Sequence, residues 1–516
     1  MIKQCILIPS VFLSLVLCVA PPSKSGADLV LSRGTHLFVD DALIERMEKV
    51  TRTLNNPVRV ADNPILRPDQ AWEGELSLQP GTVIFDDEEQ IFKMWYNSLA
   101  TKKKPDIQGF LCYAISKDGI HWIKPNLGIV EFQGSKANNI FLKWCDWTLS
   151  VIKDMEETNK DRRYKLAYWS AGVWVAFSPD GIHWTVNDQN PVVPSWASGD
   201  TFNVMRDPIS HQFWMYHKSS ITPLRKVSRL VSDDFVRWKE DKLVLEPDDH
   251  DQPDTEFYGL SPFSYGNQYL GLLWVLHTYA QQMDLQLVSS RDGLLWQRAA
   301  HRRTFLPLGF VKNYYDGHAF DSEMICSAAA PVLREGELWI YYTGYHDKHN
   351  AWEGLATPDG LPETYVGQLG VAKLREDGFI SIDATSEGYL LTRPLRFQGA
   401  QLQLNVSLRS KSGKRPDAST NVGRATWPRG QESSPIWSQL LTGSMDGNGQ
   451  VRVEVDDEQG AVIPGFAASD CNPITTGGTN QDISWKNQKD LALLNGRLVR
   501  FKFIITNAKL YSFRVR

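Results

Sequence analysis

The sequence of 516 residues contains 42% hydrophobic and 22% charged residues, a globular composition that predicts two or three domains and excludes a disordered chain. Its formal net charge of −5 offers no basic surface for a polyanion, so a nucleic acid partner is not expected. Motifs typical of nucleotide binding and of zinc hydrolases, such as GxGxxG and HExxH, are absent from it.

Residues 1–27 predict an export signal followed by a short linker. The first part carries a lysine near its start and then an apolar run too short to span a bilayer. Cleavage after Ala20 would leave a proline first, which makes cleavage after Ala27 an alternative. The "LVLC" that ends at Cys18 resembles a lipoprotein signal apart from the leucine before the cysteine. No later segment is apolar enough to span a membrane, so we expect the mature protein in the periplasm or outside the cell.

Removal of this signal would leave four cysteines: Cys112, Cys145, Cys326 and Cys471. None of them belongs to a CxxC pair, so we expect no zinc site and at most two disulfide bonds. The sequence therefore implies neither a metal centre nor a disulfide-rich scaffold.

One seven-residue turn recurs along the chain as "SKDGIHW", "SPDGIHW", "SDDFVRW" and "SRDGLLW". The copies end at tryptophans spaced by 62, 54 and 58 residues: Trp122, Trp184, Trp238 and Trp296. A weaker fifth copy lies at Leu374 to Ile382. Repetition at a near-constant distance indicates that one supersecondary unit is built several times. We expect the tryptophans to pack between neighbouring units.

Each copy of the turn follows an apolar strand, and a hairpin of two strands joined by a polar turn lies upstream of it. A unit thus holds about four strands in roughly 55 to 60 residues, which is the size of one propeller blade. Helical periodicity is almost absent from this region. The sequence therefore predicts an all-β protein with a five-bladed β-propeller at residues 70–385.

After the fifth unit the strands become longer and alternate cleanly, as in "GQVRVEVDDEQG". Such alternation without the repeated turn predicts a jelly-roll-like β-sandwich at residues 386–516. Residues 28–69 precede the first unit, and we expect this lead-in segment to pack against the ring or to help close it.

The first strands of propeller blades line a central channel, so polar residues where these strands begin should converge on one funnel. Every predicted unit carries a carboxylate there: Glu73 and Glu75, Asp146, Asp200, Asp254 and Glu256, and finally Asp321 and Glu323. Four further side chains are candidate substrate-binding groups: His277, His318, His346 and Lys218. Like charges at close range repel, so packing alone would not gather these acids, although some could lie on solvated loops instead.

Paired carboxylates suit the cleavage of a glycosidic bond, in which one protonates the leaving oxygen and the other attacks the sugar or activates water. The repeated units, acidic strand starts and trailing sandwich together resemble the five-bladed propeller glycosidases of glycoside hydrolase families 32 and 43. The resemblance is greatest to exported bacterial proteins similar to the amino-terminal domain of family 32. It implies hydrolysis of an oligo- or polysaccharide, with Glu75 as nucleophile or base, Asp200 as transition-state stabiliser and Glu256 as general acid. It implies no metal or other cofactor.

The stabiliser motif of that family, Arg-Asp-Pro, occurs at Arg206 to Pro208. Alignment of the hairpins, however, places Asp207 at the outer turn of its hairpin, so we prefer Asp200. The family's Asn-Asp-Pro-Asn-Gly and Glu-Cys signatures are missing, which leaves a catalytically silent carbohydrate-binding propeller as one alternative. A sialidase-like hydrolase is another, because its Asp-box turns resemble the repeated turn.

Overall fold

A computed structural model of the chain describes residues 29–73, 78–98, 109–145, 147–219, 224–310, 319–349, 366–408 and 449–516. The predicted export signal lies outside these ranges, as do the candidate site residues Glu75, Asp146 and His318. The described part consists of strands and three short 3-10 helices: η1 (Lys160–Arg162), η2 (Ala300–Arg302) and η4 (Ala492–Leu494). None of these helices is long and apolar enough to cross a membrane.

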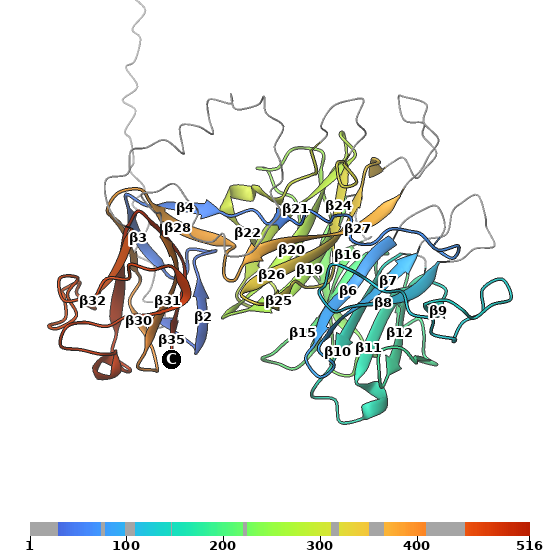
Figure 1. The fold of residues 1–516 in the computed structure, drawn as a ribbon, viewed down its shortest axis with the longest axis horizontal. Coiled ribbons are helices and arrows are strands. Elements are labelled where there is room, and N and C mark those ends of the chain that lie inside the picture. Colours follow the sequence, from blue (N-terminus) through green and yellow to red (C-terminus); the bar gives the residue numbers. More distant parts are fainter. Residues whose placement is uncertain are drawn as a thin grey trace, which may run out of the picture.

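Figure 1 shows a β-sandwich beside a larger ring of sheets. The first sheet of the ring contains β6 (Leu78–Asp86), β7 (Ile91–Ser98), β8 (Phe110–Ser116) and β9 (Ile140–Lys143). The second contains β10 (Leu149–Lys153), β11 (Tyr164–Trp169) and β12 (Gly172–Ser178), which pairs with β13 (Thr185–Val186) and β14 (Val193–Pro194). The third contains β15 (Phe202–Arg206), β16 (Phe213–Ser219), β17 (Lys226–Ser232) and β18 (Lys239–Leu245).

The remaining sheet of the ring joins two antiparallel units through a single parallel pair, Met283 with Met324. One unit contains β19 (Thr255–Tyr265), β20 (Gln268–His277) and β21 (Gln282–Ser290), which pairs with β22 (Trp296–Arg298) and β23 (Thr304–Leu306). The other contains β24 (Met324–Ser327), β25 (Val332–Arg334), β26 (Glu337–Tyr345), β27 (Gly367–Arg375) and β5 (Val58–Arg59).

These units are arranged as a β-propeller. The main strands of each unit pair antiparallel, and apart from β5 their order in space follows their order in the chain. The first strands β6, β10, β15 and β19 contact one another in succession, and β26 and β27 of the last unit contact β6. Radial repetition of this kind is typical of propellers, and it is compatible with the predicted five blades.

Strand β5 from the lead-in segment completes the last unit. It pairs antiparallel with β27 through Val58 with Lys373 and Arg59 with Ala372. The Arg59 guanidinium donates to the carboxylate of Asp321 over 2.6 Å, and both groups belong to this unit. Residues 58 and 59 of the predicted lead-in segment therefore form the outer strand of the last unit.

The repeated turn is held by its own serine and aspartate. In the first copy the Ser116 hydroxyl accepts the N–H of Gly119 over 2.9 Å. The Asp118 carboxylate accepts the N–H groups of Ile120 and His121 over 2.9 and 2.8 Å. The aspartate makes the same pair of bonds in the other three copies: Asp180, Asp234 and Asp292. A side chain that satisfies two main-chain donors makes the turn a rigid unit.

Three of these turns are fastened to the preceding unit by an aromatic side chain from its second strand. Tyr341 donates to the carbonyl of Gly119 over 3.0 Å. The Trp95 indole N–H donates to the carbonyl of Gly181 over 2.6 Å, and the Tyr216 hydroxyl donates to the carbonyl of Gly293 over 2.7 Å. The glycines have φ values of 72°, 82° and 69°, which explains why glycine is used at this position.

The third copy carries Phe235 where the others have glycine, at a φ of 69°. Its ring is fully buried against Phe213, with centroids 5.1 Å apart, and against Phe177 of the preceding unit. A buried aromatic thus replaces the hydrogen bond of the other copies. The motif tryptophans pack between units as predicted: Trp296 is buried, whereas Trp122, Trp184 and Trp238 are partly buried.

Two sheets form the sandwich. The first contains β1 (Leu29–Val30), β30 (Leu395–Arg396), β34 (Val499–Thr506), β29 (Gly388–Thr392) and β3 (Ile44–Glu48), with β32 (Gln450–Asp457) also on β34. The second contains β33 (Gly478–Asp482), β31 (Leu402–Leu408), β35 (Ala508–Val515), β28 (Ile380–Ala384) and β4 (Thr51–Leu54), with β2 (Gly34–Leu37) also on β35. Alternate residues of β34 are buried between the sheets, as the sequence pattern predicted.

The sandwich extends beyond the boundaries predicted for it. The sequence analysis assigned residues 28–69 to a lead-in segment and residues up to 385 to the propeller. In the structure β1 to β4 belong to the sandwich sheets, as does β28. The reason lies in β28, where Ile382 and Ala384 are buried in the sandwich core and β4 and β35 flank the strand.

An apolar cluster joins the sandwich to the propeller. Leu37 and Leu54 approach it from the sandwich, and Phe263 and Phe305 from the propeller. Phe379 lies between them and stacks on Phe305 with centroids 6.1 Å apart.

The four cysteines of the described residues are buried and do not form disulfide bonds with one another.

We expect Gly293→Ala to destabilise the propeller more than Gly128→Ala. Both glycines have a φ of 69°, so each substitution carries the strain of a left-handed alanine, roughly 1 to 2 kcal/mol. A Cβ at residue 293 would also lie 2.3 Å from the Trp214 ring, whereas one at residue 128 would meet no atom within 4 Å. Overpacking should add about 1 to 3 kcal/mol at residue 293, measurable by thermal or urea denaturation. Equal losses in the two variants would contradict the packing of the turn against the neighbouring unit.

Candidate functional site

The first strands of the ring begin at one mouth of the channel and end at the other. Where they end, a cavity of about 510 Å³ is lined by residues from every unit, among them Asp86, Lys153 and Arg206. Asp86 is buried there and lies 2.8 Å from both Lys93 and Lys153. The charges of this mouth are therefore satisfied within the protein.

A cluster of charged and aromatic side chains lies at the other mouth, where β15 and β19 begin. We call it the Asp200 cluster; its members are Asp200, Lys218, Arg225, Glu256, Tyr258 and His349. Asp200 precedes β15, Lys218 is on β16, and Arg225 precedes β17. Glu256 and Tyr258 are on β19, and His349 follows β26.

Each carboxylate of the Asp200 cluster is paired with a cation. The Lys218 ammonium lies 2.5 Å from the Asp200 carboxylate, and Arg225 forms an ion pair with Glu256. Tyr258 lies between these pairs: its ring centroid is 4.3 Å from the Lys218 ammonium and 5.2 Å from the Arg225 guanidinium. His349 contacts the same ring, with centroids 5.2 Å apart. A single aromatic ring thus holds two cations and an imidazole in one place.

Main-chain hydrogen bonds fix the positions of these side chains. The Lys218 amide donates to the Thr201 carbonyl over 2.8 Å, which continues the β15–β16 ladder up to Asp200. The Thr148 hydroxyl donates to the Asp200 carbonyl over 2.6 Å and so ties β15 to the preceding unit. The Phe257 amide donates to the Arg225 carbonyl over 3.0 Å. The two ion pairs therefore stand on strands from neighbouring units.

The electrostatics of the Asp200 cluster disfavour additional positive charge. Burial lowers the pKa of Lys218, although the Asp200 carboxylate acts in the opposite direction. Burial also lowers the pKa of His349 to about 4, and the charges of Arg225 and Lys218 contribute to the decrease. His349 is therefore neutral near pH 7, and a neutral imidazole can both donate and accept a hydrogen bond.

A small pocket adjoins the Asp200 cluster. Trp147 and Trp274 line it together with Tyr258, Tyr345 and His349. Aromatic walls beside hydrogen-bonding groups are typical of sites that bind ligands with both apolar and polar faces.

Two candidate residues are buried and have partners within the protein. Glu73 is fully buried and accepts hydrogen bonds from the Tyr96 hydroxyl and the Lys124 ammonium, each over 2.7 Å. Asp321 is also buried and accepts from Arg59 and from the Tyr342 hydroxyl. The Glu73 carboxylate connects segments of the first unit and the Asp321 carboxylate connects segments of the last unit, whereas the sequence analysis placed both among the substrate-binding groups.

The other described candidates lie at the same mouth, but they form hydrogen bonds or ion pairs with residues that do not belong to the Asp200 cluster. Asp254 accepts the Tyr279 N–H over 3.1 Å, and His277 lies 3.3 Å from Asp284. Glu323 accepts from Gln282 over 2.9 Å, and His346 lies 3.3 Å from Asp347. The structure thus brings Asp200, Lys218 and Glu256 together, and the remaining candidates around them.

Sequence reasoning missed Arg225, Tyr258 and His349. Tyr258 lies two residues after Glu256, but a β-bulge between Phe257 and Gly259 interrupts the alternation of side chains there, so strand periodicity does not place it. Arg225 and His349 precede β17 and follow β26 outside the regular strands, so no periodicity marks them.

Asp207 lies at the β15–β16 turn, as the hairpin alignment predicted, and β15 separates it from Asp200. Its buried carboxylate accepts the Ser210 N–H and hydroxyl over 2.7 and 2.6 Å and the Tyr269 hydroxyl over 2.5 Å. Burial acts to raise the pKa of Asp207, but these hydrogen bonds outweigh it and hold the pKa below its usual value. The Arg-Asp-Pro sequence therefore caps a hairpin here.

No family model matches the chain, and no curated protein matches its sequence. Among solved structures, the chain is similar to one described as a glycoside hydrolase, with 15% identity, 62% of this chain and 91% of that chain covered, and a TM-score of 0.42. A second similar structure is from the GH130 family of mannoside phosphorylases, which is described as containing glycoside hydrolases that target β-1,2-mannosidic linkages in Candida mannan. It has 14% identity and a TM-score of 0.41, and the match covers 63% of this chain and 94% of that chain. A fructofuranosidase from Schwanniomyces occidentalis has 9% identity, coverage of 89% and 96%, and a TM-score of 0.40.

The lowered pKa of His349 predicts a pH dependence of stability. Between pH 6.5 and about 4 the unfolded chain takes up a proton at this histidine that the folded protein does not bind. Stability should therefore fall as the pH falls through this window, by about 1 to 2 kcal/mol for a partly exposed group. We expect His349→Gln to reduce this loss in denaturation experiments at pH 6.5 and pH 4.5. An unchanged loss in the variant would contradict the neutral state of His349 in the folded protein.

Proposed function

We propose that the protein is an exported glycoside hydrolase that cleaves a glycosidic bond at the Asp200 cluster. The observation that carries the proposal is the meeting of Asp200 and Glu256, from neighbouring units, beside the aromatic face of Tyr258. Carboxylates supply the acid, the base and the nucleophile of glycoside hydrolysis, and aromatic faces stack on sugar rings.

In this proposal Glu256 is the general acid that protonates the leaving oxygen. Asp200 orients the sugar and stabilises the positive charge that develops on its ring in the transition state. Glu75 is the nucleophile or base from the first unit, and it lies outside the described residues. The hydroxyl groups of the sugar take over hydrogen bonds that Lys218 and Arg225 now direct at the two carboxylates. Neutral His349 is placed to donate to or accept from one of these hydroxyl groups.

The pairing of both carboxylates with cations favours a second candidate function, a carbohydrate-binding propeller without turnover. Lys218 and Arg225 occupy carboxylate oxygens of Asp200 and Glu256 that would carry the proton of a catalytic acid or accept a proton as a base. A network of satisfied charges of this kind can bind sugar hydroxyl groups without any proton transfer. Isothermal titration against a glycan panel, combined with release of reducing sugar, separates the two functions, because binding without release identifies the silent module.

We expect Glu256→Gln to lower kcat by about 10² to 10⁴-fold on a glycan that the wild-type protein cleaves, which is the usual contribution of a general acid. The loss should be much smaller on an aryl glycoside, because a phenolate leaves without protonation. Asp200→Asn should lower kcat on both substrates, because stabilisation of the transition state is needed in either case.

Glu246→Gln is the matched control, since Glu246 also pairs with a cation, Lys226, but follows β18 and is not a member of the Asp200 cluster. It should leave kcat unchanged. Equal losses on the glycan and on the aryl glycoside in Glu256→Gln would show that Glu256 is not the general acid. A fully active Glu256→Gln protein would remove the Asp200 cluster from the mechanism altogether.

A further inference from the structure

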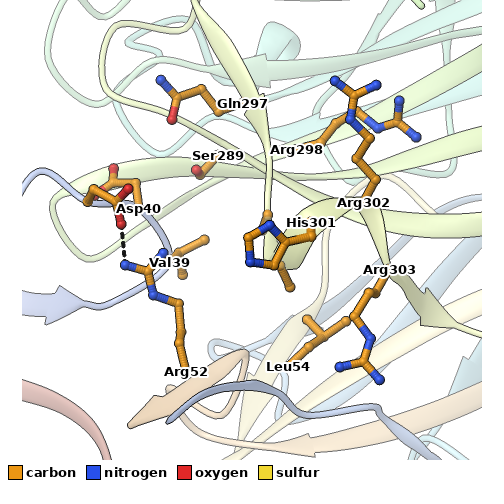
Figure 2. Close-up of a pocket in the computed structure, with 13 residues that line it drawn as sticks. Val39, Asp40, Arg52, Leu54, Ser289, Gln297, Arg298, His301, Arg302 and Arg303 are labelled. Carbon is orange, nitrogen blue, oxygen red and sulfur yellow. Dashed lines mark hydrogen bonds and ion pairs between the residues drawn. The ribbon is translucent and has the colours of Figure 1, made fainter. Parts of the chain in front are cut away.

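A second cavity lies between the sandwich and the propeller, away from the Asp200 cluster. Its volume is about 320 Å³. Arg52 of β4 lines it from the sandwich side, and Ser289 of β21 and the segment 297–303 line it from the propeller side. Figure 2 shows the His301 ring over the cavity, between Arg52 and Arg303.

The charges around this cavity do not cancel. Three arginines of the wall form ion pairs: Arg52 with Asp41, Arg298 with Asp251, and Arg302 with Asp248 and Asp251. Asp40 of the wall pairs with Arg291, which is not part of the lining. The fourth arginine of the wall, Arg303, has no carboxylate partner in the described ranges, and neither has His301. Both side chains are exposed. The cavity thus carries an unpaired guanidinium next to a free imidazole.

One buried polar atom of the wall lacks a partner among the described residues. It is the Nε of Arg52, which is buried without an acceptor. Polar groups that are removed from water normally find hydrogen-bond partners, so this atom is available to a ligand in the cavity. Ser289, which is 3% exposed, also lines the cavity.

The backbone that presents His301 and Arg303 is held in an unusual conformation. Ala300, His301 and Arg302 form a left-handed turn with φ values of 48°, 55° and 64°. None of the three is glycine, and such backbone is disfavoured for other residues. Conformations of this kind persist where the surrounding structure imposes them, and they cluster at sites that clamp ligands.

We propose that this cavity binds a small oxyanion, a carboxylate, phosphate or sulfate group carried by a small molecule. The Arg303 guanidinium provides the paired N–H donors that match two oxygens of such a group. Arg52 Nε, the Ser289 hydroxyl and the His301 ring supply further donors around it. The proposal does not depend on the hydrolase activity, because the cavity shares no residue with the Asp200 cluster.

The test is isothermal titration calorimetry of the full chain with sodium glucuronate, sodium phosphate and sodium sulfate at constant ionic strength. At least one of the three should bind with a stoichiometry of one. Arg303→Gln should weaken that binding by tenfold or more, and Ser289→Ala by a smaller factor. Tighter binding of glucuronate identifies a carboxylate ligand, and tighter binding of phosphate or sulfate identifies a tetrahedral oxyanion.

Arg237→Gln is the matched control, since Arg237 is an exposed arginine on the repeated turn of another unit. It removes one positive charge and should leave the affinity within about twofold of the wild type, because surface charges at long range are screened. Absence of saturable binding for all three anions would overturn the proposal. Equal weakening in Arg303→Gln and Arg237→Gln would overturn it as well, because it would show attraction by net charge alone.

Discussion

Closure of the ring is the constraint on which the rest of this structure depends. A ring of sheets has two free edges until its last unit is completed, and here the outer strand of that unit comes from the segment before the first unit. Two residues of β5 pair with β27, and main-chain hydrogen bonds from Val60 to Val371 and between Leu66 and Leu369 continue the contact. The Arg59 side chain adds to it, because it donates to the buried carboxylate of Asp321 and to the Pro307 carbonyl.

The same segment also builds the second domain. Strands β1 to β4 enter both sheets of the sandwich before β5 reaches the ring. The apolar cluster around Phe379 then fills the space between the two domains. The sandwich and the propeller are therefore coupled through shared chain as well as through packing, and the geometry of one fixes the position of the other.

The repeated turn made the propeller predictable, because its chemistry is local. Ser116 and Asp118 satisfy main-chain donors within five residues, so the sequence motif by itself determines the conformation of the turn. The assignment of β1 to β4 and of β28 was not predictable, because these strands have two to five residues and partners several hundred residues away. A short strand has too few positions to show a periodicity.

The candidate site was predictable to the extent that strand position decides it. Asp200 and Glu256 stand where first strands begin, and the structure places both at one mouth of the channel beside Lys218. Glu73 and Asp321 satisfied the same rule and are nonetheless structural, because Lys124 and Arg59 reach them from distant parts of the chain. The sequence shows where the acidic residues are, but it does not show which lysine or arginine forms an ion pair with each of them in the fold.

The pairing of β2 with β35 makes the sandwich depend on two segments that are far apart in the chain. Gly34 pairs with Val515, so β2 cannot be completed before the residues between them have been synthesised. Contacts of such large sequence separation also form slowly. A strand edge without its partner invites aggregation, so β2 is the edge that an incompletely folded chain exposes until β35 has joined the sheet.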